Sequence, residues 1–347
     1  MKTPTLVLFC VVAVCMQAAL AETPASDTWL NQTRLQAAST PLQAYSNGTT
    51  GVADSETKTC SCSFMAPARA PKQHTIEGVA GGVLVPTAYL MNPGPKDEPF
   101  GMPAISTTFI GMCGRKNLLT MSVSETFWGR LELSYALGRM DTGNLNHVVK
   151  KTINNYLEDR NIYMHMLNAR FLLIEENSWD IPVPAVTVGA HFKCNDSISD
   201  INSRLGIPLD VMGYDDHHGM EYTVMATKTM QFDPIPPIEV SVGLRNTRAS
   251  NIGYLGFADE CKTLLELGVT MYATDWLSVR YEFRRKEKAL GDAPVGGMLE
   301  GEENWHGINV AMEPIDNLSI NVGVGFFGDV ANQKDAVGPS VSLAYAF

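Results

Sequence analysis

Ten ionisable side chains lie in runs where apolar and polar residues alternate, so that each charge falls on the polar face of its run. Ile238, Val240, Val242 and Leu244, for example, alternate with Glu239 and its polar neighbours. Ionisable groups within a membrane must pair with one another or face water. The charges therefore predict either a salt-bridged filling of a narrow barrel or the lining of a water channel. The ten are Arg130, Glu132, Arg170, Lys193, Glu221, Glu239, Arg245, Glu266, Arg280 and Glu282.

A second group with ligand chemistry is the run Asp215-Asp216-His217-His218. Carboxylates and imidazoles are ordinary ligands of metal ions, so a cation site is one interpretation. Adjacent residues of a strand point to opposite faces, however, and only alternate members of the run could then share one ion. We favour a solvated external loop that ends just before a strand, and we predict neither a metal site nor a cofactor.

No signature of an enzyme is present in the sequence. It contains no Gly-x-Ser-x-Gly elbow, no His-Glu-x-x-His motif and no phosphate-binding loop. His165 and His191 fall on neighbouring predicted strands, but His165 has the outward parity, so we expect no catalytic triad and no enzyme. The net charge of −11 argues against nucleic acid as a partner.

The elements that must position the ten charges are strands, because the alternation has a period of 2 along the chain. Residues 131–137 and 318–326 are clear examples. A soluble sandwich or barrel would alternate in the same way. The runs extend over about 8 to 13 residues, which suits strands that cross a membrane at a tilt. Short connections alternate with long ones, and aromatic residues such as Trp128 and Trp276 lie beside the turns, which also favours a membrane-spanning barrel.

The carboxy-terminal run is apolar at every second position, with Val341, Leu343, Tyr345 and Phe347 separated by small residues. This pattern resembles the assembly signal by which the barrel assembly machinery recognises bacterial outer-membrane barrels. Counting back from Phe347 gives twelve strands, an even number, as closure with both ends in the periplasm requires. The predicted strands lie near residues 105–112, 116–124, 129–139, 161–173, 184–194, 219–230, 237–247, 263–273, 275–286, 304–313, 317–327 and 338–347.

The fold class that follows is all-β: an antiparallel up-and-down transmembrane β-barrel of about 12 strands, formed by residues 75–347 and surrounded by outer-membrane lipid. The strand-like segment 75–90 has three candidate positions. It is an extra N-terminal strand, a piece folded into the lumen, or the true first strand.

The residues before the barrel are predicted to have two parts. Residues 1–21 are a signal peptide, with an apolar run after Lys2 and a small-residue cleavage site at Ala19-Leu20-Ala21. Cleavage is favoured over a lipid anchor at Cys15, because a lipidated cysteine normally follows Gly or Ala. Residues 22–74 form a low-complexity, disordered extension. The chain is therefore expected in the bacterial outer membrane.

Five cysteines remain after the predicted cleavage, so at least one thiol is left unpaired or joins another molecule. Cys113, Cys194 and Cys261 each fall at the external end of a predicted strand. A disulfide between Cys194 and Cys261 is a hypothesis that this shared level suggests. Cys60 and Cys62 are separated by one residue, and a bridge between them would be strained.

Two distinctive stretches are Thr75-Ile-Glu-Gly-Val-Ala-Gly-Gly-Val-Leu-Val-Pro86 and Gly129-Arg-Leu-Glu-Leu-Ser-Tyr135. Others lie at residues 160–165, 184–190, 222–228, 253–257 and 311–324. In this order, the stretches resemble an uncharacterised bacterial outer-membrane family catalogued as domain of unknown function 3034. The resemblance implies an outer-membrane β-barrel and no known activity.

The leading functional hypothesis is a passive or weakly selective channel for small hydrophilic solutes, because the charges of the polar face have balanced signs. A closed barrel with a structural or adhesive role through its external loops is the alternative. An outer-membrane hydrolase is the third class. Twelve strands lie between small filled barrels and open porins, so strand number does not decide among them.

Overall fold

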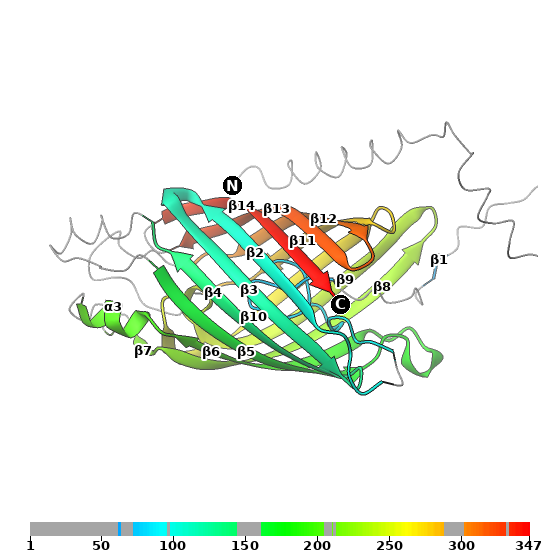
Figure 1. Ribbon diagram of the computed structural model, residues 1–347, viewed down its shortest axis with the longest axis horizontal. Helices are drawn as coiled ribbons and strands as arrows, with labels where there is room; N and C mark the ends of the chain where they lie inside the picture. The colour runs from blue at the N-terminus through cyan, green and yellow to red at the C-terminus, as the bar shows by residue number, and fades with distance from the viewer. Residues whose placement is uncertain are drawn as a thin grey trace, which may run out of the picture. The chain divides into compact units, whose positions relative to one another are not determined.

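The computed structural model describes residues 62–63, 72–95, 98–143, 161–204, 210, 213–287, 302–330 and 333–347. The predicted signal peptide and nearly all of the predicted extension lie outside these residues. In the described part of the chain, twelve long strands form one closed antiparallel barrel (Figure 1). The strands are β2 Ala104–Met112, β3 Lys116–Phe127, β4 Leu131–Asp141, β5 Asn161–Ile174, β6 Ala185–Asn195, β8 His218–Phe232, β9 Ile235–Ala249, β10 Phe257–Tyr272, β11 Leu277–Arg284, β12 Trp305–Ile315, β13 Leu318–Val330 and β14 Gln333–Ala346.

The barrel closes where the last strand pairs with the first. Residues Ser340 to Ala346 of β14 pair with Ile110 to Ala104 of β2, and all other neighbours are consecutive long strands. Two short strands are added, because β1 Cys62–Ser63 pairs with β8 and β7 Tyr214–Asp216 pairs with β10. The predicted up-and-down barrel of twelve strands is therefore confirmed.

The two ends of the barrel differ in their connections. At one end, which we call the turn end, β8 and β9 are joined by residues 233–234 and β12 and β13 by residues 316–317. The opposite end, the loop end, carries the longer β4–β5, β6–β8 and β11–β12 connections, and helix α3 Ile198–Arg204 lies there (Figure 1). In outer-membrane barrels the short turns face the periplasm, which assigns the turn end to that side.

The predicted asymmetry is less regular than a strict short-and-long alternation. Among the connections that the structure describes are three short 3-10 turns: η1 Cys113–Arg115, η2 Ser178–Asp180 and η3 Ser250–Gly253. The first of them joins β2 to β3 at the loop end, so that end is not built from long loops alone.

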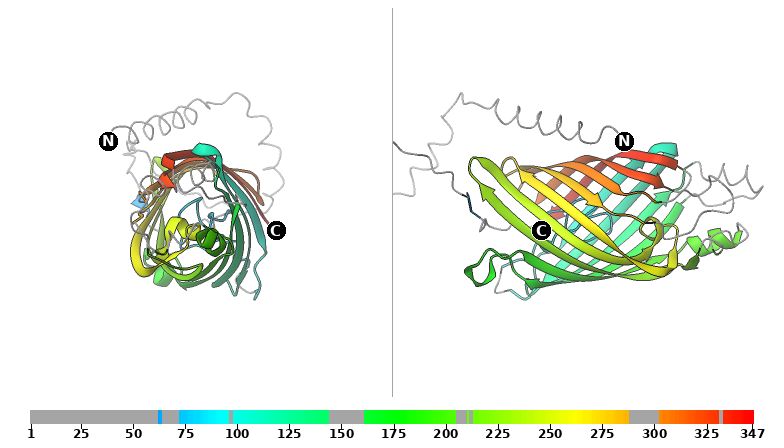
Figure 2. Two further views of the ribbon diagram at one scale, coloured as in Figure 1. Left: turned by 90° about the vertical axis from the view of Figure 1, so that its left-hand side faces the viewer. Right: turned by 180° about the vertical axis from the view of Figure 1, so that it is seen from behind.

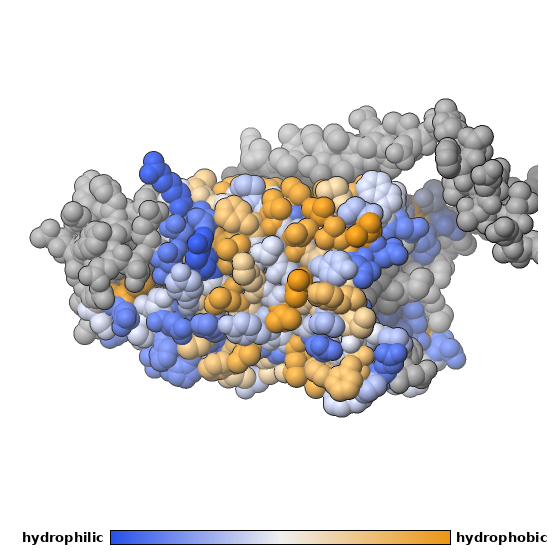
Figure 3. Space-filling model, viewed as in Figure 1, coloured by the Kyte–Doolittle hydropathy of each residue, from blue (hydrophilic) through white to orange (hydrophobic). Residues whose placement is uncertain are grey.

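The outer surface of the barrel is apolar at alternate positions of each strand. Leu167 in β5, Val224 in β8 and Leu244 in β9 are about half exposed although they are large hydrophobic residues. Figure 3 shows the result as an apolar band, with a more hydrophilic surface at each end of the barrel. Such a band is what the hydrocarbon region of a bilayer requires of a barrel.

No helix among the described residues is long and apolar enough to cross a membrane.

The interior is occupied by residues 72–92, which we call the plug. Residues 73–91 are buried throughout, and the segment forms turns with two isolated bridges, His74 to Ala80 and Gly81 to Pro86. The left panel of Figure 2 looks along the barrel and shows these residues inside the ring of strands. Of the three predicted alternatives for residues 75–90, the structure shows the second: the segment is folded into the lumen.

Candidate functional site

The plug enters and leaves the barrel at the turn end. At its start, the Lys72 ammonium is 2.8 Å from the Glu313 carboxylate and donates to the Asp316 carbonyl at 2.7 Å. At its end, the Asn92 amide donates to the carbonyl oxygens of Met102 and Phe347, both at 3.1 Å. Because both ends lie at one mouth, the plug is a loop inserted from a single side.

Glu282 of β11 binds the backbone of the plug at a run of three N–H groups. Its carboxylate accepts from Val83 at 3.0 Å, Leu84 at 3.1 Å and Val85 at 2.8 Å. Gly82 makes the approach possible, since a Cβ at this position would overlap the carboxylate. Successive N–H groups that converge on one anion are a known way to bind negative charge.

A second anchor lies at Glu132 of β4 and Arg170 of β5, whose side chains are 3.1 Å apart. Glu132 accepts from the N–H groups of Ala80 at 3.2 Å and Met91 at 2.7 Å. Arg170 donates to the carbonyl oxygens of Ala80 and Thr87. The wall side chains thus supply partners for plug backbone groups that lack a regular ladder, as buried backbone requires.

Glu77 of the plug completes a buried network of charges. Its carboxylate contacts Lys193 of β6, Arg245 of β9 at 3.3 Å and Arg284 of β11 at 2.6 Å. Those cations also contact Glu221 of β8 and Glu266 of β10, at distances of 2.7 to 3.1 Å. This six-charge network contains three acids and three bases and is neutral only while Glu77 is present.

Electrostatics keep Glu77 ionised in this position. Burial alone would raise the pKa of Glu77, but Arg245, Arg284 and Lys193 hold it well below its ordinary range. A buried ion network is weak evidence for overall stability, but removing one member leaves an uncompensated charge, which costs about 3–5 kcal/mol. The network therefore makes the wall depend on the plug.

His74 fixes the first turn of the plug against two strands. Its Nδ1 is 2.9 Å from Ser106 Oγ of β2, and its Nε2 is 2.6 Å from Ser124 Oγ of β3. Burial lowers the pKa of His74 to about 4. The imidazole is therefore neutral at physiological pH, with one nitrogen donating and the other accepting.

The loop-end half of the interior is closed by an apolar layer, which we call the cap. The plug residue Ile76 reaches this layer, and Trp305 and Phe327 pack edge to face in it with ring centroids 5.3 Å apart. The space left within the cap is about 30 Å³. Besides these three residues, the cap contains Ile110, Met112, Leu118, Met140, Ile252, Tyr254 and Val330.

The turn-end half contains an open cavity of about 380 Å³ below the plug. Its lining mixes charged and aromatic side chains, including Lys72, Glu239, Tyr272, Trp276 and Arg280. Arg280 links the cavity to the plug, because it donates to the Val85 carbonyl at 3.2 Å and contacts Glu239 at 3.0 Å. The turn-end part of the bore therefore contains polar space next to the plug.

Nine of the ten side chains chosen from the sequence lie inside the barrel, each less than a tenth exposed. Arg130 is the exception and corrects the predicted set. It lies in the turn before β4, and its exposed side chain contacts Glu175 at 2.9 Å. The sequence reasoning missed Arg284 and Glu77. The first has the same strand parity as Arg280 and Glu282 and lies two residues after Glu282.

The four residues of the predicted assembly signal point outward. Val341, Leu343 and Phe347 are about half exposed and Tyr345 somewhat less, and the Tyr345 and Phe347 rings pack edge to face at 5.0 Å. They form part of the apolar outer surface. Their recognition by the assembly machinery stays a prediction.

The structure does not contain the loop-to-loop disulfide that was hypothesised between Cys194 and Cys261. Cys113, Cys194 and Cys261 all have free thiols, although each lies toward the loop end as expected. A shared level does not bring the sulfur atoms of separate strands together. Cys60, and the Cys62 side chain, lie outside what the structure describes.

The two histidines considered for a triad have other partners. His191 hydrogen-bonds to Asn168 at 2.9 Å and Thr223 at 2.8 Å inside the barrel. His165 faces outward, where it hydrogen-bonds to Tyr135 and pairs with Asp196 at 2.9 Å. Neither has a serine partner among the residues that the structure describes.

Closed strand topology, an apolar outer band and an interior of paired charges define a transmembrane β-barrel of the outer-membrane type with a plugged lumen. The chain belongs to the family described as Protein of unknown function (DUF3034), whose model matches residues 71–344. No curated protein matches the chain.

Similar solved structures include the KdgM porin, with 12% identity over 70% of this chain and 99% of that chain and a TM-score of 0.41. The NanC porin has 8% identity over 70% and 98% of the two chains and a TM-score of 0.38. The outer membrane phospholipase of Salmonella typhi has 8% identity over 73% and 95% and a TM-score of 0.38. Likenesses this distant carry no argument about function.

Proposed function

We propose that the protein is a gated channel of the outer membrane, in which the plug closes a water-lined passage for small hydrophilic solutes. The observation that carries the proposal is the single-sided insertion of the plug. Both Lys72 and Asn92 are held at the turn end, so the plug can leave toward the periplasm without threading through the barrel. The passive channel expected from the sequence thereby gains a gate.

The chemistry of the wall supports a water-filled open state. The groups that hold the plug are ionised or hydroxyl-bearing side chains, such as Glu132, Glu282 and Thr227, and water can replace the plug as their partner. An apolar wall would instead favour permanent filling, because exposing it to water costs free energy in proportion to its area.

The charges of the plug-facing wall predict weak ion selectivity. With Arg284 in place of Arg130, the predicted set contains five acids and five bases. The six-charge network keeps one excess positive charge when Glu77 leaves, whereas Glu239 and Glu282 outnumber Arg280 nearer the turn end. A positive group and a negative group in series favour neither cations nor anions strongly.

Planar-bilayer conductance tests the proposal. The full-length protein should conduct rarely, and a variant lacking residues 72–92 should conduct continuously with weak ion selectivity. Gly82→Leu should also raise the open fraction, because its side chain overlaps Glu282 and displaces the plug. Gly111→Ala is the matched control, since a Cβ there has no neighbour closer than 3.7 Å. A plugless barrel that migrates as folded yet never conducts would overturn the proposal.

The alternative is a permanently closed barrel with a structural or adhesive role. The specific observation in its favour is the cap, which leaves only about 30 Å³ among its apolar side chains. The same measurement distinguishes the two, because a closed barrel predicts no current in either the plugless variant or Gly82→Leu.

A further inference from the structure

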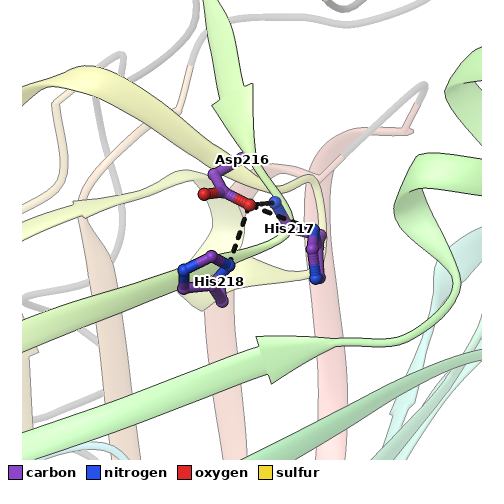
Figure 4. A group of neighbouring side chains, drawn as sticks. All are labelled: Asp216, His217 and His218. Atoms are coloured by element: carbon purple, nitrogen blue, oxygen red, sulfur yellow. Dashed lines mark hydrogen bonds and ion pairs between the residues drawn. The ribbon is translucent and has the colours of Figure 1, made fainter.

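Three side chains with metal-ligand chemistry converge at the loop end, where β7 gives way to β8. β7 ends at Asp216, β8 begins at His218, and the chain bends at His217 between them. The bend interrupts the strand alternation that would have sent neighbouring side chains to opposite faces. Figure 4 shows Asp216, His217 and His218 gathered around one carboxylate.

The geometry of the three side chains suits a shared ion. Asp216 Oδ1 is 3.0 Å from His217 Nδ1 and 2.9 Å from His218 Nδ1. One ligand atom from each residue lies within 4.8 Å of the other two. Tetrahedral zinc with bonds of about 2.0–2.1 Å keeps its ligand atoms about 3.3 Å apart. The two distances from the carboxylate to the imidazoles are therefore within a few tenths of an ångström of this spacing.

The surroundings hold the carboxylate and one imidazole in place while leaving access from outside. The backbone N–H of His217 donates to Asp216 Oδ1 at 2.7 Å. The ring of His218 lies beside Phe192, with centroids 6.0 Å apart. Arg248 pairs with Asp215 at 2.6 Å, so the cation that lies next to the cluster is already paired with another acid. The three ligand side chains are between 29% and 46% exposed.

We propose that Asp216, His217 and His218 form a binding site for one divalent transition-metal ion at the loop end of the barrel. Two imidazoles and a carboxylate prefer ions such as Zn²⁺, Ni²⁺ and Cu²⁺, whereas Ca²⁺ and Mg²⁺ prefer sets of oxygen ligands. Three protein ligands leave a position open for water. The site is independent of the plug and of the proposed channel.

Calorimetric titration of the untagged full chain with Ni²⁺ tests the site. The protein should bind one equivalent that the His217→Ala/His218→Ala double variant lacks, and Asp216→Asn should weaken binding roughly tenfold or more, on the scale at which lost metal-site groups act. Ca²⁺ in excess should not displace the ion. Heat-modifiable migration in electrophoresis verifies that each variant folds.

His165→Ala is the matched control, because its imidazole lies on the same rim and pairs with a single carboxylate, Asp196, at 2.9 Å. It should bind Ni²⁺ as the unchanged protein does. Equal binding by the double variant, or an equal loss in His165→Ala, would overturn the proposal. Cys194→Ser, which changes the residue opposite His218 in the β6–β8 ladder, should keep its affinity. A loss there would overturn the assignment of three ligands.

Discussion

The two halves of the bore are filled by different kinds of contact. Toward the turn end, the plug is held by hydrogen bonds and ion pairs next to a cavity of about 380 Å³. Toward the loop end, Ile76 packs into the cap, where about 30 Å³ remains, and the six-charge network of Glu77 lies beside it. Polar contacts can be exchanged for water at modest net cost, whereas apolar packing loses its free energy when water enters. The comparison indicates that the cap keeps water from passing and that the contacts at the turn end fix the position of the plug.

Loss of Glu77 should have the largest effect on the binding of the plug to the barrel wall. Glu77→Ala leaves Lys193, Arg245 and Arg284 facing only two acids, and docking should weaken by about 3–5 kcal/mol. Hydrogen exchange at the amides of Val83 to Val85 measures it, since these groups bond to the wall only when the plug is docked. Unchanged protection would contradict this account of the network.

The cap should respond to a buried tryptophan and not to an exposed one. Trp305 is 4% exposed, so Trp305→Ala should destabilise the barrel by about 3–5 kcal/mol. Trp276, at the turn-end cavity, is 52% exposed, and Trp276→Ala should cost far less. Urea unfolding midpoints in detergent compare the two. Equal shifts would mean that the two ends are not closed differently.

Acid should loosen the polar half through His74. Docked His74 has a pKa of about 4, whereas an exposed histidine has a pKa of about 6.5. Between these values the undocked plug binds more protons. Docking is therefore strongest above pH 6.5 and weakens as pH falls toward 4, by about 3 kcal/mol over the whole window. The charge of Glu132 raises the pKa of docked His74, and the charge of Arg170 lowers it.

Protease sensitivity of the plug, followed against pH, measures the effect of His74. His74→Gln keeps a donor and an acceptor for Ser106 and Ser124 but does not titrate. The variant should therefore lose a large part of the pH dependence. The same curve in both proteins would exclude His74 as its source.

The rim cysteines should have the smallest effect. Cys194→Ser and Cys261→Ser should leave the unfolding midpoint unchanged, within about 0.5 kcal/mol, since neither thiol is part of a disulfide. Both thiols should react with an alkylating reagent in the absence of reductant. Reaction of these two positions only after reduction would restore the disulfide hypothesis.

The strands could be predicted from the sequence because alternation is a property of each strand by itself. Phe347 fixed the starting point, and the period of 2 assigned the inward face of β8 to β11 with Glu221, Glu239, Glu266 and Glu282 on it. Arg130 was placed wrongly, because β4 begins at Leu131 and not at residue 129, after Trp128 and Gly129 turn the chain with positive φ.

The plug could not be placed in the same way. Residues 75–90 have no helical or strand period in the structure, and their partners are side chains up to about two hundred positions away, such as Glu282. Local pattern contains no information about contacts of that kind. The convergence of Asp216, His217 and His218 could not be predicted for a related reason, since the bend at His217 interrupts the alternation that a continuous strand would have.

The attachment of the plug to β2 has a kinetic consequence. The plug stays connected through the residues between Asn92 and Ala104, so its return to the bore is an intramolecular step. Linkers of this length give effective concentrations in the millimolar range. Closure would then proceed at the same rate however dilute the protein is, and a free peptide with the plug sequence would compete only at comparable concentrations.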